Sequence, residues 1–171
     1  PLNANAHQLY RRWHKSLQRF ETSKVQSHHP DTMGATVIVL GMGNIGTGAY
    51  EAMAQQYGGA VLGVDDNDRK LVQHRLQYRR VVAADASDPD FWHRVKLSDV
   101  ELVMLALTNH QENMRVGTLL GELGYTGRIA AVVRFAEEGE ELEKLGISAF
   151  NLYAQAGAGF ASHAAQNLEN P

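Results

Sequence analysis

The sequence predicts an α/β protein of the Rossmann type, a three-layer fold with an open, six-stranded parallel sheet and an amphipathic helix before it. Three observations predict this fold. Short apolar runs alternate with helix-like segments about six times along the chain, an order that is typical of a parallel sheet. The first run, residues 36–40, leads directly into a glycine-rich loop at 41–46. The second run ends on Asp65, an acidic residue at the position where such folds often bind a ribose.

Each strand is expected from a short run of Val, Ile, Leu and Ala, the composition of strands that are buried on both faces. The expected strands are residues 36–40, 60–64, 80–84, 102–107, 128–133 and 149–152. The expected helices run from the glycine loop to about residue 57, and over 67–78, 88–96, 110–124, 137–145 and 155–168. Glycines at several of the expected helix ends support these boundaries.

The N-terminal segment differs from the rest of the chain. Residues 5–25 are predicted to form an amphipathic helix, because large apolar residues recur on one stripe and arginines and lysines supply the polar side. A polar segment that includes Pro30 interrupts this pattern. The sequence therefore predicts two parts, an N-terminal helix with its linker at 1–33 and a Rossmann-type domain at 34–171.

The composition excludes several classes of function. The chain has 171 residues and a formal net charge of −3, which gives no sign of the basic face that nucleic-acid binding requires. It contains no cysteine, so disulfides, thiolate metal sites and cysteine nucleophiles are excluded. No other metal site is expected either, because no carboxylate completes a ligand set beside His28 and His29. No run of 18 consecutive apolar residues is present, so no transmembrane segment is predicted.

The glycine loop has the context that phosphate binding requires. It follows an apolar strand directly and opens a helix. Gly41 is expected to permit the tight turn, Gly43 to let a pyrophosphate approach the backbone, and Gly46 to let the helix pack closely on the strand. The N-terminus of the helix then offers free N–H groups and a partial positive charge to the phosphate.

Acidic and polar residues follow the next three strands and are expected at the same edge of the sheet. Asp65 comes 19 residues after Gly46, where a carboxylate accepts hydrogen bonds from ribose hydroxyls and disfavours a 2′-phosphate. This pattern favours NAD, NADH or an adenosine nucleotide over NADP. Asp85 is expected beside the adenine, and Thr108 along the crevice. The alternative is that Asp65, Asp66 and Asp85 merely cap the following helices.

No catalytic machinery is evident, so the chain is not expected to be an enzyme. A dehydrogenase needs a proton donor or acceptor beside the nicotinamide, and of the eight histidines only His110 is expected near the binding edge. Two alternatives stay open. One is an NAD-dependent oxidoreductase or its cofactor-binding half, and the other is a methyltransferase-like domain.

Beyond these motifs, residues 36–166 resemble the regulator-of-potassium-conductance (RCK) domain, also called the Trk-type NAD-binding domain. The resemblance rests on the runs at 37–46, 64–67, 84–88, 107–109 and 112–113. The run at 84–88, ADASD, departs from the family's signature by an alanine at its first position. The chain looks most like the cytoplasmic domain of Kef-type, glutathione-regulated potassium efflux transporters, which are cation/proton antiporters.

The resemblance implies a regulatory domain that binds AMP or NAD(H), forms a homodimer and gates a membrane transporter from the cytoplasmic face of the inner membrane. The implied nucleotide-binding residues are Gly41, Met42, Gly43, Asn44, Ile45, Gly46, Asp65, Asp66, Asn67, Lys70, Asp85, Ala86, Leu107 and Thr108. Lys70 is placed to reach a phosphate or Asp66, or simply to be solvated. Arg134 matches a basic position that could hold a carboxylate of glutathione or its adducts, with an interface salt bridge as the alternative.

Overall fold

The computed structural model describes residue 32 and residues 34–169. By its internal contacts the chain divides into one unit at 1–30 and a second at 31–171, and the described residues all belong to the second. The helix expected at 5–25 lies outside the described residues. The division of the chain at residue 33 therefore stays a prediction.

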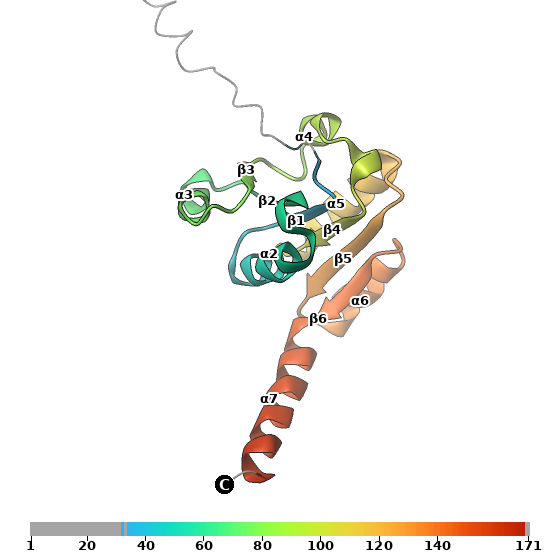
Figure 1. Cartoon of the computed structure of the whole chain (residues 1–171). Coiled ribbons are helices and arrows are strands. Elements are labelled where there is room, and N and C mark those ends of the chain that lie inside the picture. Colours follow the sequence, from blue (N-terminus) through green and yellow to red (C-terminus); the bar gives the residue numbers. More distant parts are fainter. Residues whose placement is uncertain (1–31, 33, 170–171) are drawn as a thin grey trace, which may run out of the picture. The chain divides into compact units, whose positions relative to one another are not determined.

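The second unit is built on one six-stranded sheet, as the sequence predicts (Figure 1). The strands are β1 (Val37–Leu40), β2 (Val61–Asp65), β3 (Val81–Ala83), β4 (Leu102–Leu105), β5 (Arg128–Val133) and β6 (Ser148–Asn151). Their order in the sheet is β3-β2-β1-β4-β5-β6, and every neighbouring pair is parallel. The order reverses at β1, which lies between β2 and β4. Ligands of open α/β sheets bind beyond the carboxyl ends of the strands at such a reversal.

Helices connect the strands and cover both faces of the sheet. They are α2 (Asn44–Tyr57), α3 (Asp68–Leu76), α4 (Pro89–Arg94), α5 (His110–Glu122), α6 (Ala136–Glu143) and α7 (Leu152–Glu169), with short 3₁₀ turns η1 (Gly58–Ala60) and η2 (Leu97–Asp99). The side chains of β1 alternate between two hydrophobic clusters. Ile38 and Leu40 join the cluster that contains α4, α5 and α6 residues, whereas Val37 and Val39 pack with α2 and α3 residues. The three layers follow from this alternation.

The observed elements match the expected ones closely, with one notable shift. Helix α7 begins at Leu152 and not at residue 155, directly after β6. Its start is fixed by Asn151, whose side-chain oxygen accepts a hydrogen bond from the N–H of Ala154 at 3.0 Å. Asparagine is favoured at this capping position because its side-chain oxygen accepts a hydrogen bond from a free N–H of the first turn.

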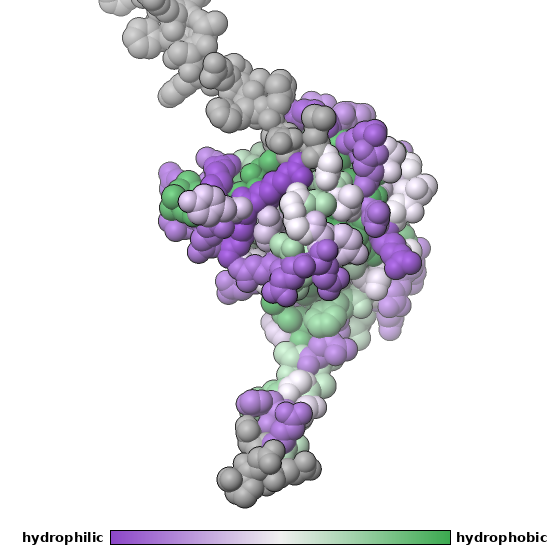
Figure 2. Space-filling model, viewed as in Figure 1, coloured by the Kyte–Doolittle hydropathy of each residue, from purple (hydrophilic) through white to green (hydrophobic). Residues whose placement is uncertain are grey.

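Helix α7 is exposed along almost its whole length. Every described side chain from Tyr153 to Gln166 is exposed, and the aromatic residues Tyr153 and Phe160 are 58% and 74% exposed. Hydrophobic surface also gathers where β6 meets α7 (Figure 2). Two exposed residues of this region are Phe150 of β6 and Phe135, whose ring contacts Tyr153 of α7. Within the part of the chain that the structure describes, no helix has the length and hydropathy that crossing a bilayer requires.

Candidate functional site

A cavity of about 230 Å³ lies at the carboxyl ends of β1 to β4, where the strand order reverses. The strand register brings the edge together, because the N–H of Gly41 donates to Val64 and the N–H of Ala106 donates to Leu40, both at 2.8 Å. The cavity is lined by Gly41, Gly43, Val64, Asp65, Asp66, Lys70, Ala84, Asp85, Ala86, Ala106, Leu107, Thr108 and Glu112. Residues from four separate strand ends therefore face one space.

The glycines of the loop are required for different reasons. Gly41 has a φ of +86°, and a Cβ there would lie 2.8 Å from the carbonyl oxygen of Ala106. A Cβ at Gly46 would collide with the carbonyl oxygen of Gly41. By contrast, a Cβ at Gly43 would meet no atom within 4 Å. The free protein thus has room for a side chain at position 43. A side chain there would, however, take up space in the cavity that a ligand could otherwise fill.

The N-terminus of α2 is open toward this cavity. Gly43 is the N-cap of the helix, and no side chain caps its first turn. The first N–H groups of a helix have no partner within the helix, so this end can donate to a phosphate. Asn44 and Ile45 begin the helix and are exposed, whereas Gly46 is buried.

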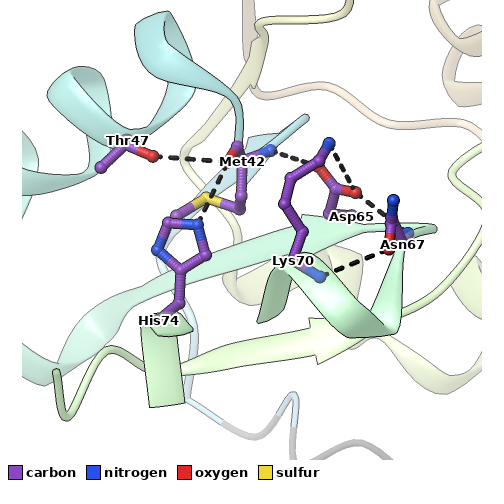
Figure 3. A network of polar contacts seen from close by, with 6 residues as sticks. All are labelled: Met42, Thr47, Asp65, Asn67, Lys70 and His74. Atoms are coloured by element: carbon purple, nitrogen blue, oxygen red, sulfur yellow. Dashed lines mark hydrogen bonds and ion pairs between the residues drawn. The ribbon is translucent and has the colours of Figure 1, made fainter. Parts of the chain in front are cut away.

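The backbone of Met42 is held from both sides (Figure 3). Its N–H donates to Oδ2 of Asp65 at 2.8 Å, and its carbonyl accepts a hydrogen bond from Nε2 of His74 at 3.1 Å. Arg79 Nη1 donates to the other ring nitrogen of His74 at 3.0 Å, an arrangement that assigns the ring proton to Nε2. Arg79 also pairs with Glu51 of α2. The loop is therefore fixed by β2 and α3 before any ligand arrives.

Asp65 is the most heavily bonded carboxylate of the site. Oδ1 accepts from the N–H of Asn67 at 3.0 Å, and Nζ of Lys70 lies 3.1 Å from Oδ1 and 2.9 Å from Oδ2. Burial alone raises the pKa of Asp65, but the hydrogen bonds from Lys70, Asn67 and Met42 outweigh it and lower the pKa below 3.8. The side chain is 4% exposed and is ionised at neutral pH.

The other acidic residues give the cavity a negative wall. Asp66, Asp85 and Glu112 all line it. Burial, together with the charges of Asp66 and Asp85, raises the pKa of Glu112 above 4.5. Lys70 is the one cationic side chain among the lining residues of the described chain, so an anionic ligand depends on it and on the N-terminus of α2.

The structure also shows which residues cap the helices. The N-caps are Asn67 for α3, Asp88 for α4 and Asn109 for α5, each accepting a hydrogen bond from a backbone N–H of its helix. Asp65 and Asp66 cap no helix, and Asp85 accepts from the N–H and the hydroxyl of Ser87 instead. The helix-cap alternative for these three aspartates is therefore wrong, and all three line the cavity.

Most of the residues singled out from the sequence line this cavity: Gly41, Gly43, Asp65, Asp66, Lys70, Asp85, Ala86, Leu107 and Thr108. Those that do not line it are Met42, Asn44, Ile45, Gly46 and Asn67. Sequence reasoning did not select Val64, Ala84, Ala106 and Glu112. Val64, Ala84 and Glu112 did lie in the runs that carry the family resemblance, at 64–67, 84–88 and 112–113, whereas Ala106 lay in none of them.

A second cavity, of about 130 Å³, adjoins the first and shares its residues Ala106, Leu107 and Thr108. Arg134, at the end of β5, lines it, and its guanidinium lies 3.7 Å from Glu138. This ion pair joins Arg134, which follows β5, to Glu138 in the first turn of α6. Nearly half of the Arg134 side chain is exposed, so the arginine is accessible to an anion.

Comparison with known families gives one match. The model of the TrkA-N domain family matches residues 37–151, more than half of the chain. This range includes the glycine loop and every strand of the sheet. No curated protein matches the chain.

Solved structures share the fold at low sequence identity. The NAD(P)-binding domain of an exopolyphosphatase-related protein from Archaeoglobus fulgidus is 19% identical, with a TM-score of 0.69 and coverage of 77% of this chain and 98% of that one. The C-terminal domain of Kef from Shewanella denitrificans, in an AMP-bound form, is 17% identical, with a TM-score of 0.64 and coverage of 78% and 81%. The GsuK channel bound to NAD is 18% identical, with a TM-score of 0.61 and coverage of 80% and 25%.

Proposed function

The chain belongs to the TrkA-N domain family, and from that premise we propose that it is a regulatory domain that binds AMP or NAD(H) and gates a potassium transport system. The observation that carries the proposal is the cavity at the reversal of the strand order. It combines an uncapped helix N-terminus, open space at Gly43, and the carboxylate of Asp65. Together these groups suit a phosphate and a ribose.

The similar structures support an adenine nucleotide as the ligand. The Kef domain holds AMP, the GsuK channel holds NAD, and the domain from Archaeoglobus fulgidus is described as NAD(P)-binding. In the proposed pose, the phosphate lies at the N-terminus of α2, the ribose at Asp65, and the adenine beside Asp85 and Ala86.

In the proposed arrangement the domain acts as a homodimer at the cytoplasmic face of the inner membrane. Helix α7 presents exposed aromatic and small side chains, among them Tyr153 and Phe160, and exposed apolar surface of this kind marks an interaction site. A second copy of the chain is the proposed occupant. Nucleotide occupancy would then bias the geometry of the pair, and through it a membrane transporter of the Kef type.

The second cavity is the proposed place for a second effector. Arg134 offers a guanidinium next to the nucleotide site, and such a group pairs with carboxylates. Glutathione or its adducts, as the resemblance to Kef-type transporters implies, would supply the carboxylate.

The experiment that tests nucleotide binding uses two glycines of the same segment. In Gly43→Ala the new methyl group meets open space in the free protein but occupies the cavity, so we expect an unchanged Tm and loss of AMP and NAD binding by at least about tenfold. Gly48→Ala also meets open space, but it does not line the cavity. This control is expected to bind normally and to be stabilised by about 0.5–1 kcal/mol, as glycine-to-alanine changes in helices usually are. Calorimetric titration with AMP, ADP, NAD and NADH provides the affinities.

The outcome separates the proposal from its alternatives. Equal nucleotide affinities of Gly43→Ala and Gly48→Ala would contradict the proposed site. Turnover of NADH with a carbonyl substrate would favour the oxidoreductase, and binding of S-adenosylmethionine alone would favour the methyltransferase-like domain.

A further inference from the structure

The ribose-binding carboxylate is already fully occupied in the free protein (Figure 3). Asp65 accepts from the backbone N–H groups of Met42 and Asn67, and Nζ of Lys70 lies within 3.1 Å of both carboxylate oxygens. A carboxylate offers about four acceptor positions. No position is left for the two hydroxyls of a ribose, so one of the present donors has to leave when a nucleotide binds.

Lys70 is the donor that can leave. The N–H groups of Met42 and Asn67 belong to the fixed glycine loop and to the turn between β2 and α3. Releasing either would unfold that local backbone. Lys70 is a side chain on the first turn of α3 and is 47% exposed, and its four-carbon stem allows the ammonium to move without the helix.

The cavity also provides the place to which the ammonium would move. Lys70 and Gly43 line the same space, and Asp66, Asp85 and Glu112 make the rest of its charged wall negative. A ligand phosphate at Gly43 would add a further anionic partner for the Lys70 ammonium, supplied by the ligand and not by the protein. For a lysine displaced from Asp65 by a ribose, that phosphate is the most strongly charged partner, because a phosphate carries more negative charge than any one carboxylate of the wall.

We propose that Lys70 is an internal competitor for the ribose site, which exchanges Asp65 for the ligand's phosphate and so makes the site select nucleotides over nucleosides. The inference rests on the proposed nucleotide-binding function and identifies the residue that sets its specificity. A nucleoside breaks the ion pair between Lys70 and Asp65 and supplies no anion of its own, whereas a nucleotide supplies its phosphate.

The test compares AMP, adenosine and 2′,3′-dideoxyadenosine by calorimetric titration against the full chain and three variants. Lys70→Met is expected to weaken AMP about tenfold, because a charge-assisted hydrogen bond is lost. The same variant is expected to tighten adenosine about threefold, because the competitor for Asp65 is gone. Dideoxyadenosine has no diol and gains nothing. Lys70→Arg is expected to retain the preference for AMP.

Arg69→Met is the matched control. It removes the same charge from the neighbouring position of α3, at an exposed residue that does not line the cavity, and is expected to leave the ratio of the two affinities unchanged. Adenosine binding that is unchanged or weaker in Lys70→Met would overturn the competitor role while nucleotide binding stands. If the wild-type chain binds neither AMP nor NAD, the proposed function itself fails, and this inference fails with it.

Discussion

Glu112 lies in a cavity that already holds three aspartates, and its surroundings oppose its ionisation. Burial is the larger cause of its raised pKa, and the charges of Asp66 and Asp85 add to it. A proton on Glu112 therefore favours the folded state. This contribution is complete below the ordinary pKa of 4.5 and is lost as the pH rises through the raised pKa of the folded protein.

Glu112→Gln is expected to be more stable than the wild-type chain at pH 7, with the difference shrinking as the pH falls through the raised pKa of Glu112 and levelling off below 4.5. It removes one like charge from the cavity and should tighten AMP by about threefold. Thermal unfolding between pH 4 and 8 and calorimetric titration measure the two effects. A stability difference that does not depend on pH would contradict the assigned cause.

The glycine loop shows how a short element can be fixed by distant partners. Met42 is bonded through its N–H to β2 and through its carbonyl to α3, and Met42 itself is buried with Tyr50 and Leu71. Gly41 and Gly46 are in close contact across the turn. The loop is thus preorganised, and binding a phosphate does not have to order it.

Gly46→Ala tests this close packing. The new Cβ would meet the carbonyl oxygen of Gly41, a backbone atom that cannot turn away as a side chain could. We expect a loss of about 1–3 kcal/mol in the free energy of unfolding, the usual cost of overpacking. Gly48→Ala in the same helix serves again as the control. Urea unfolding of both variants gives the comparison, and equal stability would show that the contact is relaxed at no cost.

On the scale of the molecule, α7 is the element without a place in the three layers. Its residues Tyr153 and Phe160 are exposed, while the hydrophobic clusters on both faces of the sheet are complete without it. The exposed apolar side chains of α7 would be buried only if another surface packed against the helix.

Phe160→Asp is expected to leave the fold unchanged and to raise the dissociation constant of the homodimer at least about tenfold, since buried aromatic anchors dominate such interfaces. Tyr78→Asp is the matched control, because Tyr78 is 98% exposed at a position away from α7. Its φ of +57° is tolerated by aspartate. Sedimentation analysis of the two variants decides the matter. A wild-type monomer at all concentrations would overturn the dimer.

The sequence was sufficient to predict the parallel sheet, because strand-like and helix-like segments alternate along the chain. It also predicted the edge at which the cavity lies, because parallel strands all end at the same edge. It identified Gly43 from the glycine motif and Asp65 from its place at the end of the second strand. It did not predict that His74 holds Met42, or that Lys70 pairs with Asp65 rather than Asp66. These contacts depend on how α3 turns against the sheet, which a periodic pattern does not specify. Ala106 carried no signal, since an alanine at a strand end has none.

The join between β6 and α7 has a mechanical consequence. No residue separates Asn151, the last of the strand, from Leu152, the first of the helix, and the Asn151 side chain ties the first turn. An α-helix of 18 residues is about 27 Å long. A tilt of about 5° in β6 would therefore displace the far end of α7 by roughly 2 Å. The strand and the helix together form a lever arm, which amplifies a change in the sheet that is too small to alter the sheet's own packing.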